Sequence, residues 1–345
     1  MRKRKREYFT EQNIETLNLF LQNYGFAPYE ASQEYDFNQK NNDGYTALIL
    51  AAGNGNIDIV NLLLSKESSI DLTDNDGWTA LMVAAGNGYT DIANILLDRG
   101  ANIDHANNNK EIALHYAAGH GYKDTVKLLL DRGVNIHLLD NDGQAALHFA
   151  ADSGNLETVN LLLDKDASID LTDNDGRSAL HFAADSGNTE IANLLLDKGA
   201  YIDLLSSNGM TALDFVAIYG HTDTAKLLLD RGANIDLADN DGKTALDFAA
   251  INGHLHIVTL LLDRGANINI ADNGGKTALM MAVENDNIDT AQLLLDKAAN
   301  INLANPDIAQ ERLNAELDIK QTHEHWTQRF AEATPTPNVP HHQIR

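Results

Sequence analysis

The chain repeats itself with a fixed period of 33 residues, and this periodicity constrains its fold more than any other feature. The segment DNDGRSALHFAADSGN, starting at Asp173, is nearly identical to DNDGQAALHFAADSGN, which starts 33 residues earlier at Asp140. One position near the start of each copy marks the same phase throughout: Gly44, Gly77, Lys110, Gly143, Gly176, Gly209, Gly242 and Gly275. A period of this size without insertions predicts stacked supersecondary units rather than separate globular domains.

Each copy predicts two short helices joined by a tight turn and followed by a loop. In the copy that starts at Asp173, Ser178 is placed to cap a first helix, ALHFAA, which breaks at SGN. The second helix reads TEIANLLLD, with Ile191, Leu194 and Leu195 on one face. Paired alanines in the first helices predict close packing between copies. Segments such as IDLTDNDG predict an extended arm and a tight turn between copies.

The blocks DG-x-TAL-h-x-AA-x-x-G and LLLD-[KR]-GA-x-I, together with the period, resemble the ankyrin-repeat family over about three quarters of the chain. The resemblance implies an all-α repeat solenoid of stacked helix-turn-helix ankyrin repeats with short β-hairpin or turn arms. The chain departs from the family at Ala80 and Ala179, where proline is usual, and at Lys110, which replaces the turn glycine. Because a non-glycine residue at positive φ costs about 1 kcal/mol, we expect a looser turn at Lys110.

The period also predicts how the chain is organised. We expect a disordered basic leader at 1–10, an N-terminal cap helix with an arm at 11–40, a C-terminal capping helix at 305–333 and a disordered tail at 334–345. Between them, copies 1 to 8 are expected at 41–73, 74–106, 107–139, 140–172, 173–205, 206–238, 239–271 and 272–304. Such capped ends favour a monomer.

Composition narrows the classes of partner. The chain has no cysteine, which excludes disulfides and cysteine-ligated zinc, and no apolar run approaches the ~20 residues that span a bilayer. The formal net charge is −25, which disfavours direct binding to nucleic acid or anionic lipid and favours partners with a basic patch. Many of the charges recur at the ends of the second helices, where acids suit the first turn and bases suit the last turn.

Two motifs resemble functional sites, one a catalytic triad and the other a calcium-binding loop. Ser178, His181 and Asp185 stand at helical spacing, as in a nucleophilic triad, but equivalents recur in other copies, whereas catalysis needs one assembled cleft. The acidic turn before them fails as a calcium loop because Leu171 falls at the first ligand position and Phe182 at the last. The family resemblance implies that His181 forms hydrogen bonds within and between repeats. We therefore predict no catalytic residue, no metal site and no cofactor.

The family resemblance places partner-binding residues at the turn tips and after the alanine pairs, on the concave face of the solenoid. The predicted set is Tyr45, Trp78, Asn87, Glu111, His120, Gln144, Asp152, Ser153, Arg177, Asp185, Ser186, Met210, Ile218, Tyr219, Lys243 and Asn252. Aromatic residues are typical interface anchors, and the residue type at the Trp78 position changes from copy to copy, so we expect Trp78 to be exposed.

These features predict a non-catalytic scaffold that binds a protein partner. Two alternatives stay open at this point: an acidic inhibitor or immunity protein that blocks a basic enzyme, and a bacterial effector that acts on host proteins. We expect a cytoplasmic protein, and the basic run from Arg2 to Arg6 leaves nuclear import or delivery into a host cell open.

Overall fold

The computed structural model describes residues 11–30, 34–66 and 68–301, so the expected basic leader, C-terminal capping helix and tail lie outside the described residues. The described part holds seventeen helices and no strand. Its arms form turns, with isolated antiparallel bridges at Lys40–Thr46, Ala238–Thr244 and Ala271–Thr277. The chain divides into two compact units, Met1–Tyr201 and Ile202–Arg345, which are described separately.

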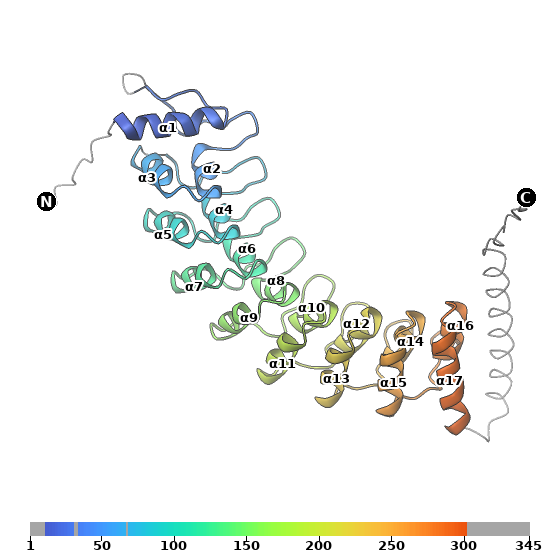
Figure 1. The fold of residues 1–345 in the computed structure, drawn as a ribbon. Helices are drawn as coiled ribbons and strands as arrows, with labels where there is room; N and C mark the ends of the chain where they lie inside the picture. The colour runs from blue at the N-terminus through green and yellow to red at the C-terminus, as the bar shows by residue number, and fades with distance from the viewer. Residues whose placement is uncertain (1–10, 31–33, 67, 302–345) are drawn as a thin grey trace, which may run out of the picture. The chain divides into compact units, whose positions relative to one another are not determined.

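In the first unit, two rows of helices run side by side (Figure 1). The first helices of the copies are α2 (Ala47–Gly53), α4 (Ala80–Gly86), α6 (Ala113–Gly119), α8 (Ala146–Asp152) and α10 (Ala179–Asp185). The second helices are α3 (Ile57–Ser65), α5 (Thr90–Asp98), α7 (Lys123–Asp131), α9 (Leu156–Leu163) and α11 (Thr189–Asp197). Within this unit each helix packs on its equivalent in the neighbouring copy, from α2 to α10 and from α3 to α11, and α1 (Glu11–Asn23) packs on α3.

The second unit repeats this arrangement. Its first helices are α12 (Ala212–Tyr219), α14 (Ala245–Ile251) and α16 (Ala278–Glu284), and its second helices are α13 (Thr222–Asp230), α15 (Leu255–Asp263) and α17 (Ile288–Ile301). Helix α17 is longer than the other second helices. Ala298 stands in it where most copies have the glycine that ends the second helix, so nothing in the local sequence stops the helix there.

The core of each copy lies between its two helices and the helices of its neighbours. The alanine pairs of the first helices are inaccessible to solvent, as at Ala150 and Ala151, and their small side chains let successive first helices approach closely. In α11 the buried residues are Ile191, Ala192 and Leu195. Leu194, which the sequence places on the same face as Ile191 and Leu195, is only half-buried.

A five-residue turn, 173–177 in copy 5, separates each arm from the next first helix; we call this turn and its equivalents the finger. One carboxylate oxygen of Asp173 accepts hydrogen bonds from the amides of Asp175 (2.9 Å) and Arg177 (2.8 Å). In copy 3, Lys110 stands at the glycine position of the finger and adopts the left-handed conformation of the finger glycines, with a φ of 61°. Its amide donates to the carbonyl of Asn107 at 2.9 Å. The expectation of a looser turn at Lys110 was therefore wrong.

Asparagines tie several fingers to the finger before them. The side-chain amide of Asn141 donates to the carbonyl of Asn108 (3.2 Å), and that of Asn174 donates to the carbonyl of Asn141 (3.0 Å). The second unit has the same bond from Asn273 to the carbonyl of Asn240, at 3.0 Å. These bonds link residues 33 apart, so they are a direct consequence of the fixed period.

Ion pairs connect successive second helices. The acid near the end of one helix pairs with the base that follows the next helix: Asp98–Arg132 (2.8 Å), Asp131–Lys165 (3.1 Å), Asp164–Lys198 (2.8 Å), Asp230–Arg264 (2.7 Å) and Asp263–Lys297 (2.7 Å). The bases that the sequence assigned to helix ends therefore also join neighbouring copies. All of these side chains are partly exposed, so water screens each pair and its contribution to stability is small.

Candidate partner-binding surface

The predicted partner-binding residues fall on two parts of each copy, the finger and the end of the first helix. The exposed members are Tyr45, Asn87, His120, Asp152, Ser153, Ser186, Tyr219 and Asn252. The half-buried members are Trp78, Glu111, Gln144, Arg177, Asp185, Met210, Ile218 and Lys243. None of the sixteen is fully buried, so all can contribute surface to a partner, but the half-buried ones already have neighbours within the chain.

Trp78 is half-buried rather than exposed as expected. Its ring packs on the ring of Tyr116 from the next copy, with centroids 4.1 Å apart and an interplanar angle of 38°. The Tyr116 hydroxyl donates to the Glu111 carboxylate, and burial together with this bond raises the pKa of Tyr116 above its ordinary value. Trp78 is thus held in place by copy 3.

A cleft of about 350 Å³ lies between copies 1 and 2. Its walls include the side chains of Tyr45 and Leu50 from copy 1 and of Trp78 and Val83 from copy 2. Asp74 and Asp76, both from the finger of copy 2, also line it; Asp76 is exposed, whereas Asp74 is buried. The cleft therefore combines aromatic walls with two carboxylates.

In copy 5, an arginine occupies the finger position that Trp78 holds in copy 2. Arg177 donates from Nε to Asp173 at 3.0 Å, and its terminal nitrogen lies 2.9 Å from the same carboxylate oxygen. The guanidinium carbon lies 4.6 Å from the centroid of the Phe182 ring, a cation–π contact. The finger of copy 5 thus supplies its own cation. Lys243 similarly pairs with Asp241 at 3.0 Å, which raises the pKa of Lys243.

Several residues at the ends of the first helices have structural roles as well as exposure. The side-chain amides of Asn87 and Asn252 donate to carbonyls of the last helical turn, at 2.8 and 2.9 Å. Ser186 donates to Asp152 of the preceding copy at 2.8 Å. Tyr219 is the most exposed of the predicted aromatic residues, with 54% of its surface accessible. It is therefore the strongest candidate anchor in the second unit.

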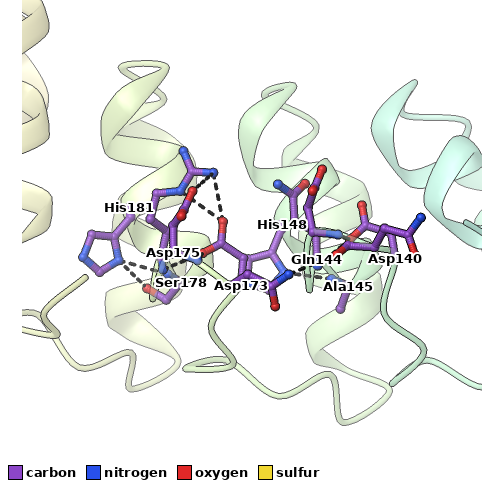
Figure 2. A network of polar contacts seen from close by, with 12 residues as sticks. Asp140, Gln144, Ala145, His148, Asp173, Asp175, Ser178 and His181 are labelled. Atoms are coloured by element: carbon purple, nitrogen blue, oxygen red, sulfur yellow. Dashed lines mark hydrogen bonds and ion pairs between the residues drawn. The ribbon is translucent and has the colours of Figure 1, made fainter. Parts of the chain in front are cut away.

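Ser178 and His181 lie together at the start of α10, but in a buried place (Figure 2). The Ser178 hydroxyl oxygen lies 3.0 Å from Nδ1 of His181, and the Ser178 amide donates to the same nitrogen at 3.0 Å. Asp185 is the last residue of the helix that these two residues begin. Both contacts of His181 Nδ1 with Ser178 lie at the start of α10, so His181 acts in the cap of its helix.

The equivalent histidines of copies 3 and 4 show the role of this position fully. Nδ1 of His148 accepts the Ala145 amide at 2.9 Å, so Nε2 carries the proton and donates to the carbonyl of Leu171 at 2.9 Å (Figure 2). His115 makes the same pair of bonds, and burial lowers its pKa to about 4. A neutral histidine at this position joins the start of a first helix to the arm of the same copy, which confirms the bonds within repeats that the family resemblance implied.

In the second unit, buried aspartates take the place of these histidines, which the sequence reasoning missed. One carboxylate oxygen of Asp214 accepts the amide and the hydroxyl of Thr211, at 2.7 and 2.8 Å. Asp247 does the same with Thr244. Burial raises the pKa of Asp214 to about 7 and also raises the pKa of Asp247. The sequence did contain a clue, because Asp214 and Asp247 stand at the helix-cap position that histidine occupies in copies 3 to 5.

The described helices include none that is both long enough and apolar enough to cross a bilayer. A search of curated proteins found no match to the chain. A family model described as "Ankyrin repeats (3 copies)" matches residues 9–107, 100–173, 166–239 and 233–305.

Proposed function

Because the chain belongs to the ankyrin-repeat family, whose repeats form a protein–protein interaction module, we propose that it is a non-catalytic scaffold for a protein partner with a basic patch. The partner would bind along the fingers and the ends of the first helices, the surface that the resemblance describes as concave. The observation that carries this proposal is the acidic, aromatic-walled cleft between copies 1 and 2. Its aromatic walls offer an anchor for a side chain of the partner, and its acidic residues favour a positively charged one.

The charge of the surface supports a basic partner. The finger acids Asp76, Asp142 and Asp175 are exposed, as is Asp152 at the end of α8. These acids belong to a chain with a net charge of −25, whose field attracts basic surfaces and repels acidic ones. Because the contribution of exposed charges falls with ionic strength, capture of the partner should weaken as salt is raised.

A combined variant tests this assignment. Trp78→Ala, Asp152→Asn, Asp185→Asn and Tyr219→Ala together remove two aromatic residues and two acids from the proposed surface. We expect recovery of the partner in a pull-down to fall at least about tenfold, because interface aromatics and charges often cost more than 1 kcal/mol each. Unchanged recovery would show that partners do not use this surface.

A matched control separates surface position from total charge. Asp91→Asn with Glu190→Gln removes two acids from the first turns of second helices, where both side chains are exposed. The control should capture the partner as the unmodified protein does. Equal losses in the two variants would show that only net charge matters.

A second candidate function, an acidic inhibitor of a basic enzyme, is favoured by the net charge of −25. It uses the same surface, so the pull-down distinguishes the two by what is captured. An inhibitor should lower the activity of the captured enzyme at a 1:1 ratio, whereas a scaffold should leave that activity unchanged.

A further inference from the structure

We propose that the cleft between copies 1 and 2 binds the side chain of one arginine of the partner, with the guanidinium on Asp74 and the aromatic walls. This arginine site rests on the proposed function and adds to it the residue type that the first unit recognises. Three features support it: the shape of the cleft, the way its acid is bonded, and an equivalent arginine inside the chain itself.

The cleft is the result of small side chains at one recurring position. Copies 1 and 2 have Leu50 and Val83 where copies 4 and 5 have Phe149 and Phe182. Without a ring at this position, space remains beside Trp78, and the resulting cleft measures about 350 Å³. Its size suits a long side chain, and its lining of aromatic and aliphatic groups suits the apolar part of an arginine.

The buried acid of the cleft is bonded in a way that leaves one of its oxygens for a ligand. Oδ1 of Asp74 accepts the amides of Asp76 (2.9 Å) and Trp78 (2.8 Å), which fixes the orientation of the carboxylate. Lys40 donates to the main-chain carbonyl of Asp74 at 3.3 Å rather than to the carboxylate. Asp74 therefore faces the cleft as an oriented carboxylate beside two aromatic rings.

Copy 5 shows what such a carboxylate binds. Oδ1 of Asp173 makes the same two amide bonds as Oδ1 of Asp74, and Oδ2 accepts the guanidinium of Arg177. That guanidinium also lies over an aromatic ring, Phe182. Copy 2 has the same acid, but Trp78 stands in place of the arginine and Val83 in place of Phe182. A partner can therefore supply in trans the group that copy 5 supplies from its own finger.

Arginine fits better than lysine for a geometric reason. A guanidinium is planar, so it can stack on Trp78 or Tyr45 while its N–H groups point at a carboxylate edge. A lysine ammonium is a strongly hydrated point charge, which loses more hydration in a cleft with apolar walls. We expect a preference of about tenfold for arginine over lysine.

The test uses the full chain and three tripeptides: acetyl-Gly-Arg-Gly-amide, its lysine counterpart and its citrulline counterpart, which is similar in shape but uncharged. Binding is followed by the shift of the Trp78 indole N–H in ¹H–¹⁵N spectra; the chain has two tryptophans, and Trp326→Phe assigns the signals. We expect saturable shifts with the arginine peptide and at least about tenfold weaker binding of the citrulline peptide. Equal affinities for the arginine and citrulline peptides, or no saturable shift, would overturn the proposal.

Asp74→Asn tests the acid without disturbing the finger. Copies 1 and 3 already have asparagine at this position, and Oδ1 of Asn41 and of Asn107 accepts the same amide bonds as Asp74. The variant should therefore fold and bind the arginine peptide at least about tenfold more weakly. Asp239→Asn removes the same charge from the finger of copy 7 and should change the affinity less than about twofold. Equal losses from the two variants would show a general charge effect and no site.

Val83→Phe tests the cleft itself. This variant installs the residue type of copies 4 and 5 and should abolish the indole shift while the helical circular dichroism is unchanged. Retained binding would contradict the proposed location.

The pull-down tests the proposed function separately from the arginine site. If the arginine peptide does not bind but the partner is still captured, only the arginine site is rejected. If the peptide binds but the combined variant captures the partner as well as the unmodified protein does, only the proposed function is rejected.

Discussion

At the scale of single residues, the finger glycines serve two purposes that the sequence alone did not separate. Gly77 has a φ of +85°, which most L-residues avoid, and a Cβ added to it would lie 2.9 Å from the amide nitrogen of Asn108. Gly100, after α5, has a similar φ of +91° but nothing within 4 Å of an added Cβ. Gly77 is therefore needed both for its backbone conformation and for the close approach of the next finger, whereas Gly100 is needed for its conformation only.

The two glycines can be compared by replacing each with alanine. Gly100→Ala should lower the free energy of unfolding by about 1 kcal/mol, the cost of a left-handed alanine. Gly77→Ala should lower it by about 1–3 kcal/mol more, because the finger of copy 3 must move away. Urea unfolding followed by circular dichroism measures both losses. Equal losses would show that the close approach of neighbouring fingers contributes nothing to the difference between the two variants in the free energy of unfolding.

At the scale of helices, the first helices depend on small residues at their mutual contacts. Ala150 in α8 is inaccessible to solvent, and α8 packs between α6 and α10. Copy 6 has Val216 at the equivalent position, where it is also fully buried. The contact therefore accepts one branched residue in α12, while the other first helices keep alanine there.

We predict that Ala150→Leu destabilises the first unit by about 1–3 kcal/mol, because the larger isobutyl side chain overfills the contact between first helices. Ala150→Val, which introduces the residue type that copy 6 has there, should cost less. Thermal unfolding measures the order of the two variants. A leucine variant as stable as the unmodified protein would mean that the first helices are not closely packed at Ala150.

The helices themselves could be predicted from the sequence because each depends on local features that recur eight times. Thr46 and Thr79 cap α2 and α4, accepting the amides of Ile49 and Met82, whereas the Ser178 hydroxyl, which was expected to cap α10, contacts Nδ1 of His181 instead. Apart from the buried aspartates Asp214 and Asp247, which bond within their own copies, the missed features involve two copies at once. The bonds between fingers, the stacking of Trp78 on Tyr116 and the cleft beside Val83 follow from the distance between copies, which a repeat unit read by itself does not contain.

At the scale of the whole molecule, the two units are expected to respond to pH in opposite directions. In the first unit the pKa of His115 is lowered to about 4, so between about pH 4 and 6.5 the unfolded state binds more protons at His115 than the folded state does, and the lowered pKa of His148 acts in the same direction. In the second unit the pKa of Asp214 is raised to about 7, so between about pH 4 and 7 the folded state binds more protons at Asp214 than the unfolded state does, and the raised pKa of Asp247 acts in the same direction.

Acidification from pH 7 to 5 should therefore destabilise the first unit through its histidines and stabilise the second through its aspartates. Each group contributes at most about 1.4 kcal/mol per pH unit. Hydrogen exchange with mass spectrometry reports the two units separately, so protection should fall in one and rise in the other. Asp214→Asn should reduce the rise, and parallel changes in both units would contradict the assignment.

The bonds between fingers have a consequence for how such a chain changes in evolution. Each copy presents to the next copy the same acceptor that it uses on the previous one, as Asn141 does between Asn108 and Asn174. Duplication or loss of a whole 33-residue segment in a gene would therefore reconnect matching partners, while any other length would place them out of phase. The repeated part of the chain can therefore gain or lose binding surface in steps of one copy.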